Sequence, residues 1–244
     1  MSLHPLPVAA VQYTPVPRDV AANVAATAAA VPPALDADAR LVVLPEMSLV
    51  GYDLAQLDDP AVWTSAADPR LDPLRDLARD AGATLVVGGP WRDADGTPRL
   101  ASLVLGPDGS CTVAAKVHLH GREVEHFAPG DAVTTVDVDG WRVALAVCFD
   151  AANPPHAAAA AAAGADLYAM SALYATGEEP RVDTHLAGTA ARHGLPTLLA
   201  NLGGVAVDGS WTSCGLSGTW GADGLRRTGV DGTGTAVAAD VLPR

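Results

Sequence analysis

The stretch Trp141-Arg-Val-Ala-Leu-Ala-Val-Cys-Phe-Asp150 decides the fold, together with the Ala-Ala-Asn-Pro-Pro-His156 that follows it. Its continuous apolar run, rich in valine, is typical of a strand that is buried on both faces of a sheet. Asn153 before two prolines predicts a helix start, because Asn caps free backbone N–H groups and proline is tolerated in the first turn. Cys148 is therefore expected where a core strand gives way to a helix, with backbone N–H groups directed at whatever binds the thiol.

The composition limits the class of protein. The chain has 244 residues, of which 49% are hydrophobic and 18% charged, so one globular domain over residues 1–244 is expected. A net charge of −13 argues against nucleic acid and against an anionic membrane surface as partners. Three cysteines without a C-x-x-C pair, no secretory leader and no strongly apolar stretch of about 18 residues predict a cytoplasmic protein.

Helices and buried strands alternate along the chain. Short apolar runs predict strands at 7–14, 41–44, 84–87, 167–170 and 196–201. Helical spacing and capping residues predict helices after Asp19, over 71–81, through the alanines after Asn153, and over 180–193. Two hairpins are inserted, one over 100–116 and one over 134–147, around turns that contain Gly and Asp. This order predicts an α/β sandwich in which mixed sheets are covered by helices.

Three polar residues each directly follow a predicted buried strand: Glu46, Lys116 and Cys148. Taken alone, each is usually structural, with Glu and Lys reaching solvent and Cys acting as a small apolar side chain. As a set they are chemically complementary. A thiol with a pKa of about 8.5 needs a base or a nearby cation to become reactive. A carboxylate can take its proton, and a lysine can keep that carboxylate ionised and face a developing oxyanion.

Three segments in register resemble the motifs of the carbon–nitrogen hydrolase (nitrilase/amidase) superfamily. They are Leu44-Pro-Glu46-Met-Ser-Leu-Val-Gly-Tyr52, then Lys116-Val-His-Leu119 with Glu123-Val-Glu-His-Phe-Ala-Pro-Gly130, and finally Val147-Cys-Phe-Asp150. Later segments around Arg192-His-Gly194, Asn201 and Gly215-Leu-Ser217 are also similar, so the resemblance covers essentially the whole chain. It implies a four-layer α-β-β-α sandwich with two mixed β-sheets covered by helices.

The resemblance also implies a function. It is that of a thiol hydrolase that cleaves a non-peptide carbon–nitrogen bond, above all a small amide to acid plus ammonia or amine. Cys148 would attack the carbonyl carbon and form a thioester, with Glu46 as general base. Lys116 would stabilise the oxyanion, with the backbone N–H of Phe149 as a second donor. Glu123 would be an additional glutamate that holds Lys116 and orients substrate.

Further implications concern partners and the neighbourhood of these residues. The resemblance implies a small-molecule amide or nitrile as substrate, a homodimer, and no metal or cofactor. Glu125 is the nearby alternative to Glu123. Asp150 would have a structural role, bonding loop backbone. The family often continues Cys-x-Asp with Arg-Phe-Pro-Glu, whereas here the sequence is Ala151-Ala-Asn-Pro-Pro-His156. The usual salt-bridged support of the nucleophile is therefore not expected in that form.

Other interpretations stay open at this point. His118, His120, Glu123, Glu125 and His126 could form a zinc site, because His-x-His places two rings on one face of a strand. The structural alternative is a polar loop whose histidines bond to backbone.

A papain-like pair would need His156, His185 or His193 as the partner of Cys148, but their sequence contexts do not indicate one. No helix is expected after Gly232-Thr-Gly234, so a dinucleotide site is not expected there. Nitrilase chemistry, N-carbamoyl hydrolysis, acyl transfer to another amine and a non-catalytic binding member of the fold remain as alternatives.

Overall fold

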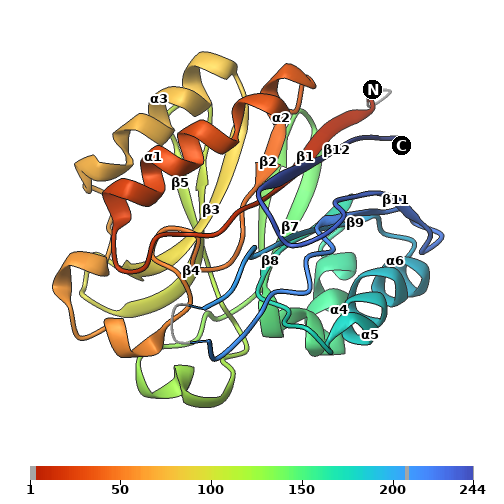
Figure 1. The fold of residues 1–244 in the computed structure, drawn as a ribbon. Helices are drawn as coiled ribbons and strands as arrows, with labels where there is room; N and C mark the ends of the chain where they lie inside the picture. Colours follow the sequence, from red (N-terminus) through yellow and green to blue (C-terminus); the bar gives the residue numbers. More distant parts are fainter. Residues whose placement is uncertain (1–3, 207–208, 244) are drawn as a thin grey trace.

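Two six-stranded mixed β-sheets stack face to face in the computed structural model, which describes residues 4–206 and 209–243 (Figure 1). The first sheet has the order β12-β1-β2-β3-β4-β5, and its strands are β1 Leu6–Gln12, β2 Leu41–Val43, β3 Thr84–Arg92, β4 Pro98–Leu105, β5 Cys111–Ala115 and β12 Ala236–Leu242. The second has the order β11-β10-β9-β8-β7-β6, with β6 Thr134–Val138, β7 Trp141–Val147, β8 Leu167–Ala172, β9 Thr197–Asn201, β10 Gly218–Trp220 and β11 Arg226–Gly229.

Each sheet has a parallel centre with antiparallel edges. The parallel pairs are β1–β2 and β2–β3 in the first sheet, and β7–β8 and β8–β9 in the second. All other neighbours are antiparallel, including β1 and β12, whose register pairs Leu6 with Leu242 and so brings the two ends of the chain together. Parallel strands that run in one direction deliver their carboxyl ends to one edge, where the loops that follow them can meet.

Helices cover the outer face of each sheet. The first sheet is covered by α1 Val20–Ala30, α2 Pro32–Asp36 and α3 Asp72–Ala81, and the second by α4 Pro154–Ala162, α5 Glu179–Val182 and α6 Gly188–His193 (Figure 1). Short 3₁₀ turns lie at Leu54–Gln56, Pro60–Val62, Pro69–Leu71, Gly121–Glu125 and Cys148–Ala152. The predicted four-layer α-β-β-α sandwich is confirmed.

Three apolar layers hold these four layers of structure together. The central layer joins the inner faces of the sheets and includes Val8, Leu41, Val86, Val143, Leu145 and Leu198. The outer layers join each sheet to its helices, with Val24, Leu74, Val42 and Val87 on one side and Ala157, Leu186, Tyr168 and Leu199 on the other. Full burial of one Val or Leu side chain contributes about 1.5–3 kcal/mol. Because both faces of these strands are buried in apolar layers, the strand sequences are apolar at consecutive positions, as predicted.

Most predicted elements are found close to their expected bounds. The Asp19 side chain caps α1 by accepting from Ala22 N at 2.9 Å, and Gly82 ends α3 in the left-handed region with φ 60. The helix predicted over 180–193 is interrupted by a π-helical turn at Asp183–Ala187. Among the described residues, no helix has both the length and the apolarity required to cross a bilayer.

The helix start predicted at Asn153 is confirmed, since α4 begins at the next residue, and Cys148 lies between β7 and α4 in the 3₁₀ turn Cys148–Ala152. The cap expected from the Asn153 side chain was wrong, because this side chain makes no capping hydrogen bond to α4. Its Nδ2 instead donates to the Phe149 carbonyl at 2.6 Å, since the turn has already placed that carbonyl within reach. The amide of Asn153 therefore stabilises the turn that carries the cysteine.

Candidate active site

Glu46 lies in a tight turn that is pressed against β3. Met47, the next residue, has φ 54, which is a left-handed backbone conformation that residues other than glycine rarely adopt. Gly88 makes the close approach possible, because a Cβ there would lie 2.4 Å from the Pro45 carbonyl oxygen and 2.9 Å from Glu46 Cα. Ser48 closes the contact by accepting from Gly88 N at 2.9 Å through its hydroxyl. The backbone at Glu46 is therefore held rigidly, which fixes the position from which its side chain extends.

Lys116 follows β5 and is fixed through its own backbone. Its N–H donates to the Leu100 carbonyl at 2.8 Å, and its carbonyl accepts from Gly130 N at 2.8 Å. A Cβ on Gly130 would lie 2.6 Å from the Ala115 carbonyl oxygen, so glycine is required for this crossing. The Pro-Gly that ends the second motif thus positions the lysine.

Cys148 occupies a strained elbow directly after β7, with φ 46. Asp150 stabilises this elbow by accepting from Val147 N at 3.0 Å through Oδ2. Its other oxygen, Oδ1, accepts from the backbone N–H groups of Val117 at 3.1 Å and His118 at 2.7 Å. Asp150 therefore ties the loop of the cysteine to the loop of the lysine, in agreement with the structural role expected for it.

Two histidines complete the surroundings of Asp150. His118 Nδ1 lies 3.1 Å from Asp150 Oδ1, and the buried His156 places Nε2 3.8 Å from Oδ2. His156 Nδ1 is 2.9 Å from the Tyr168 hydroxyl. Burial lowers the pKa of His156, which favours the neutral ring. His118 and His156 thus lie close to Asp150 in a chain that lacks the Arg-Phe-Pro-Glu continuation after Cys-x-Asp.

The side chains of Glu46, Lys116 and Glu123 meet where the segments that follow β2 and β5 come together. Lys116 Nζ donates to Glu46 Oε1 and to Glu123 Oε1, each at 2.8 Å. Glu123 also accepts from the Tyr52 hydroxyl at 2.7 Å and from His120 N at 2.7 Å. The Lys116 side chain is 1% exposed and the two carboxylates 0%. Glu46 Oε2 is buried and has no hydrogen-bond partner among the described protein groups.

This cluster forms the base of a cavity of about 470 Å³ that Cys148 also lines. All five residues predicted for the site contribute to it: Glu46, Lys116, Glu123, Cys148 and Phe149. The remaining wall is largely aromatic and aliphatic, and its residues are Tyr52, His120, Ala152, Leu173, Tyr174, Ala175, Glu178, Arg181, His185 and Trp211. A cavity of this size is typical of sites for small molecules.

The electrostatics of the cluster set its protonation states. Burial raises the pKa of Glu46, while the Lys116 charge opposes that rise and the Glu123 charge adds to it. Burial also raises the pKa of Cys148, and the Glu46 charge adds to this effect. Burial by itself would lower the pKa of Lys116, but the negative charges of Glu46 and its neighbours raise it overall. The resting site thus combines a neutral thiol with an ammonium ion.

The structure distinguishes between the two candidate glutamates. Glu123 contacts Lys116, whereas Glu125 pairs with Arg122 at 3.2 Å and its side chain is 53% exposed. The two residues lie on the same 3₁₀ turn, Gly121–Glu125, which directs them to opposite environments.

The residues of the possible zinc site are directed to different partners. His118 bonds to Asp150, His120 lies against the Phe149 ring at 4.6 Å between centroids, and Glu123 is bound to Lys116. No group of three or more His, Cys, Asp or Glu side chains within residues 4–206 and 209–243 is arranged to hold a metal ion.

Two of the three histidines considered as partners of Cys148 are engaged elsewhere. His156 is bonded to Tyr168, and His185 Nδ1 lies 2.7 Å from the Tyr174 hydroxyl. The Cys148 thiol donates to the Leu173 carbonyl at 3.7 Å. The third candidate, His193, ends α6.

Several residues of the site received no role from the sequence. Tyr52 stands at the end of the first motif, and its Tyr-after-Gly position was the only available signal. The sequence around Gly88 and Trp211 does not indicate a role in the site, because each contacts residues that are distant in the chain. Gly88 contacts the turn of Glu46, and Trp211 contacts Tyr52.

Comparison with known proteins supplies the relatives of this chain. The family model for carbon–nitrogen hydrolase matches residues 7–237. A hydrolase in the pqqF 5' region of Pseudomonas protegens is 34% identical over 165 residues, which is 66% of this chain and 56% of that protein. A nitrilase of Pyrococcus abyssi is 34% identical over 152 residues, covering 59% of this chain and 55% of that protein. The matched region thus spans little more than half the length of either curated relative.

A solved structure agrees over almost the whole chain. It is that of a double mutant of the amidase from Nesterenkonia sp. AN1 in complex with acrylamide. The TM-score is 0.87 at 26% sequence identity, and the alignment covers 98% of this chain and 91% of that one.

Proposed function

The chain belongs to the carbon–nitrogen hydrolase family, and from this premise we propose that it hydrolyses a small non-peptide amide to an acid and ammonia or an amine through a thioester on Cys148. The observation that carries the proposal is the contact of Lys116 with both Glu46 and Glu123 at the base of a cavity that Cys148 lines. The acrylamide bound to the Nesterenkonia amidase, a small neutral amide, supports this choice of substrate class.

The first step is acylation of the cysteine. The Cys148 sulfur attacks the amide carbonyl carbon, and Glu46 takes the thiol proton as the S–C bond forms. The raised pKa of Cys148 means that the thiol enters the reaction neutral, so proton transfer accompanies attack. Glu46 Oε2 is the available acceptor, because Oε1 is bound to Lys116.

Lys116 stabilises the tetrahedral oxyanion that this attack creates. Its pKa is raised by the surrounding negative charges, so it stays an ammonium ion throughout the cycle. The backbone N–H of Phe149 is the proposed second donor to the oxyanion. Glu123 balances the lysine charge, and its hydrogen bonds from Tyr52 and His120 keep it in place.

Collapse of the intermediate releases the amine. The C–N bond breaks as Glu46 returns the proton to the departing nitrogen, which leaves Cys148 acylated. Water then attacks the thioester while Glu46 takes one of its protons, and the C–S bond breaks. The thiolate that leaves is reprotonated from Glu46, and the acid is released. Two acyl transfers thus replace one difficult hydrolysis.

The same thiol and base would serve other carbon–nitrogen substrates. The Pyrococcus abyssi nitrilase favours nitrile hydrolysis as the second candidate. N-carbamoyl hydrolysis and a purely binding role are the remaining alternatives. A homodimer and the absence of a cofactor are expected on the family resemblance.

The test uses the purified protein with small amides, nitriles and N-carbamoyl amines. Ammonia release identifies the productive class, and peptide mass mapping identifies an acyl group on Cys148. An amide-dependent acyl adduct that is absent from Cys148→Ala supports the proposal. Hydrolysis of an amide by Cys148→Ala at the wild-type rate would refute it, and adducts only with nitriles would transfer it to the second candidate.

A further inference from the structure

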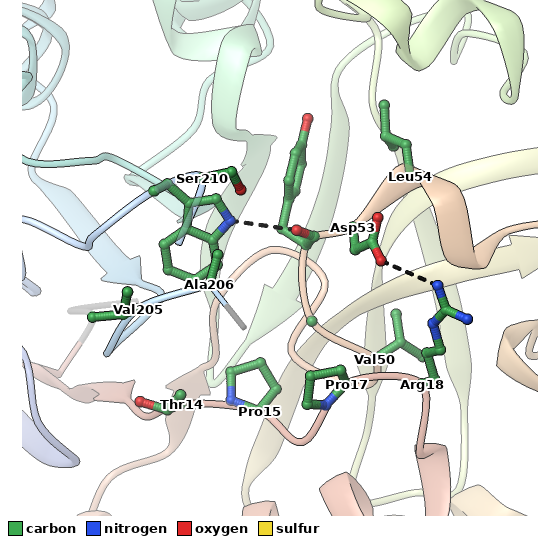
Figure 2. A pocket seen from close by; sticks show the side chains of 13 residues that line it. Thr14, Pro15, Pro17, Arg18, Val50, Asp53, Leu54, Val205, Ala206 and Ser210 are labelled. Atoms are coloured by element: carbon green, nitrogen blue, oxygen red, sulfur yellow. Dashed lines mark hydrogen bonds and ion pairs between the residues drawn. The ribbon is translucent and has the colours of Figure 1, made fainter. Parts of the chain in front are cut away.

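A second cavity, of about 520 Å³, shares lining residues with the cavity of the candidate active site. One wall is the loop that contains Pro15 and Pro17, and another is the turn that contains Asp53 and Leu54 (Figure 2). The third wall is formed by Val205, Ala206, Ser210 and Trp211. Tyr52 and Trp211 line both this cavity and the one that contains Cys148. These two aromatic residues are therefore the wall that the cavities share.

The shared wall is fixed from both sides. Trp211 Nε1 donates to the Tyr52 carbonyl at 3.4 Å, and the Trp211 carbonyl accepts from Ala206 N at 2.9 Å. The Tyr52 hydroxyl donates to Glu123, which is itself bound to Lys116. The residue after Trp211 is also held, because Thr176 N donates to the Thr212 carbonyl at 2.7 Å.

The charges that line the active-site cavity already have partners. Glu178 pairs with Arg181 and accepts from Ala175 N at 2.9 Å. At the base, Lys116 joins Glu46 and Glu123. The rest of the described lining is mainly aromatic and aliphatic, including Phe149, Leu173, Tyr174 and Trp211. A charged acyl group would have to displace one of these pairs, whereas a neutral one would not.

We propose that Trp211, packed beside Tyr52, sets the upper size of the acyl group, so that the protein acts on amides of short, neutral carboxylic acids. This rests on the proposed acylation of Cys148. The cavity beyond the wall is the space that a longer acyl chain would need. Removal of the indole would join the two cavities and let such chains extend into it.

The expected effect follows from the energetics of hydrophobic pockets. One methylene more or less changes kcat/KM by about 10–200-fold in such a pocket. Beyond the length that the wall permits, the wild-type rate should therefore fall steeply with each added methylene. The same chain should be accepted when Trp211 is shortened, because the added methylenes then enter apolar space.

The experiment compares acyl-chain length profiles of the wild type and Trp211→Ala. One series is acetamide, butanamide, hexanamide and octanamide, with kcat/KM as the readout. The other is the p-nitrophenyl esters of the same acids, which acylate Cys148 as the S–C bond forms, the C–O bond breaks and nitrophenolate leaves. The nitrophenolate burst and the acylated peptide measure this step without requiring amide turnover.

Matched variants test whether a change in the acyl-chain length profile comes from the bulk of Trp211 or from another effect of the substitution. Trp211→Phe keeps a ring but loses the N–H donor, and Val205→Ala removes bulk from the second cavity alone. Both should retain the wild-type length profile. Trp211→Leu, a milder truncation, should accept intermediate lengths and provides the same test if Trp211→Ala does not fold.

The outcomes are distinct. A gain of about 100-fold or more for six- and eight-carbon acyl groups, relative to acetyl, in the truncated variants supports the wall. Parallel profiles for the wild type and both truncations in the ester series overturn it. If the half-amide of succinic acid reacts faster than butanamide, the neutral class is wrong. Esters that acylate Cys148 while no amide is hydrolysed would refute the proposed function, and the ester profiles would still decide the role of Trp211.

Discussion

Lys116 Nζ lies 2.8 Å from Glu46 Oε1 and leaves Oε2 of the same carboxylate buried without a hydrogen-bond partner among the described groups. An unpaired buried carboxylate oxygen is costly, because burial removes its hydration without replacing it. Such groups in native proteins often have a catalytic explanation. Here one oxygen is committed to the lysine, and the other is the acceptor proposed for the proton of Cys148.

Replacement of Cys148 by alanine should abolish turnover while the fold remains intact. The thiol is the proposed nucleophile, and its loss removes only one small side chain from the cavity. Activity assays together with circular dichroism and thermal unfolding check both parts. Cys111→Ala, on the partly buried strand β5, is the matched control and should keep wild-type activity.

Glu46→Gln should lower kcat by about 10²–10⁴-fold, the usual contribution of a general base. The amide oxygen can still accept from Lys116, so the free energy of unfolding should change little. Lys116→Ala should reduce activity too, but it should also destabilise the protein by about 3–5 kcal/mol, because two buried carboxylates lose their counterion. Equal losses of stability in the two variants would contradict this distinction.

The pH profile of kcat/KM should have an acid limb above the ordinary carboxyl range of about 4. Glu46 must be ionised to act as base, and burial raises its pKa, so activity is lost as the pH falls through that raised value. The Glu123 charge contributes to the rise. In the residual activity of Glu123→Gln, the limb should therefore move to lower pH. An acid limb at pH 4 or below in the wild type would be incompatible with the raised pKa.

Gly88→Ala should lower both stability and kcat. The added Cβ would lie 2.4 Å from the Pro45 carbonyl oxygen, so the turn that carries Glu46 must move. Overpacking of this kind costs about 1–3 kcal/mol. Denaturant unfolding and steady-state kinetics measure the two effects. Gly234→Ala is the control, because nothing lies within 4 Å of its Cβ position, and its stability should match that of the wild type.

His156→Ala should reduce kcat by loosening the loop that Asp150 holds. His156 bridges Tyr168 and the region of Asp150, and it is buried. Its loss leaves the Tyr168 hydroxyl without this partner, at a cost of about 1–3 kcal/mol. His156→Asn, which keeps polar atoms at the position, should recover part of kcat. Wild-type kcat in His156→Ala, with stability alone reduced, would show that the residue does not position the elbow.

Local sequence patterns were sufficient to predict most helices and strands of this protein. Apolar runs of strand length and helical spacing predicted most elements, because burial on two faces requires consecutive apolar residues. Glu46, Lys116 and Cys148 are candidate reactive residues because each follows such a run, and the family resemblance adds Glu123. The cap predicted from the Asn153 side chain is absent, because its Nδ2 donates to the Phe149 carbonyl in the intervening 3₁₀ turn.

The sequence by itself determined the layered fold and the candidate reactive residues, since apolar runs over a few neighbouring positions mark the buried strands and the polar residues that follow them. Only the tertiary structure shows that Glu123 contacts Lys116 while the Glu125 side chain is exposed, because one short turn directs the two residues to opposite environments. It alone placed Trp211 against Tyr52, 159 positions away, as a wall between two cavities. Such contacts arise when separate loops are packed at one edge of the sheets, and no local pattern encodes that meeting.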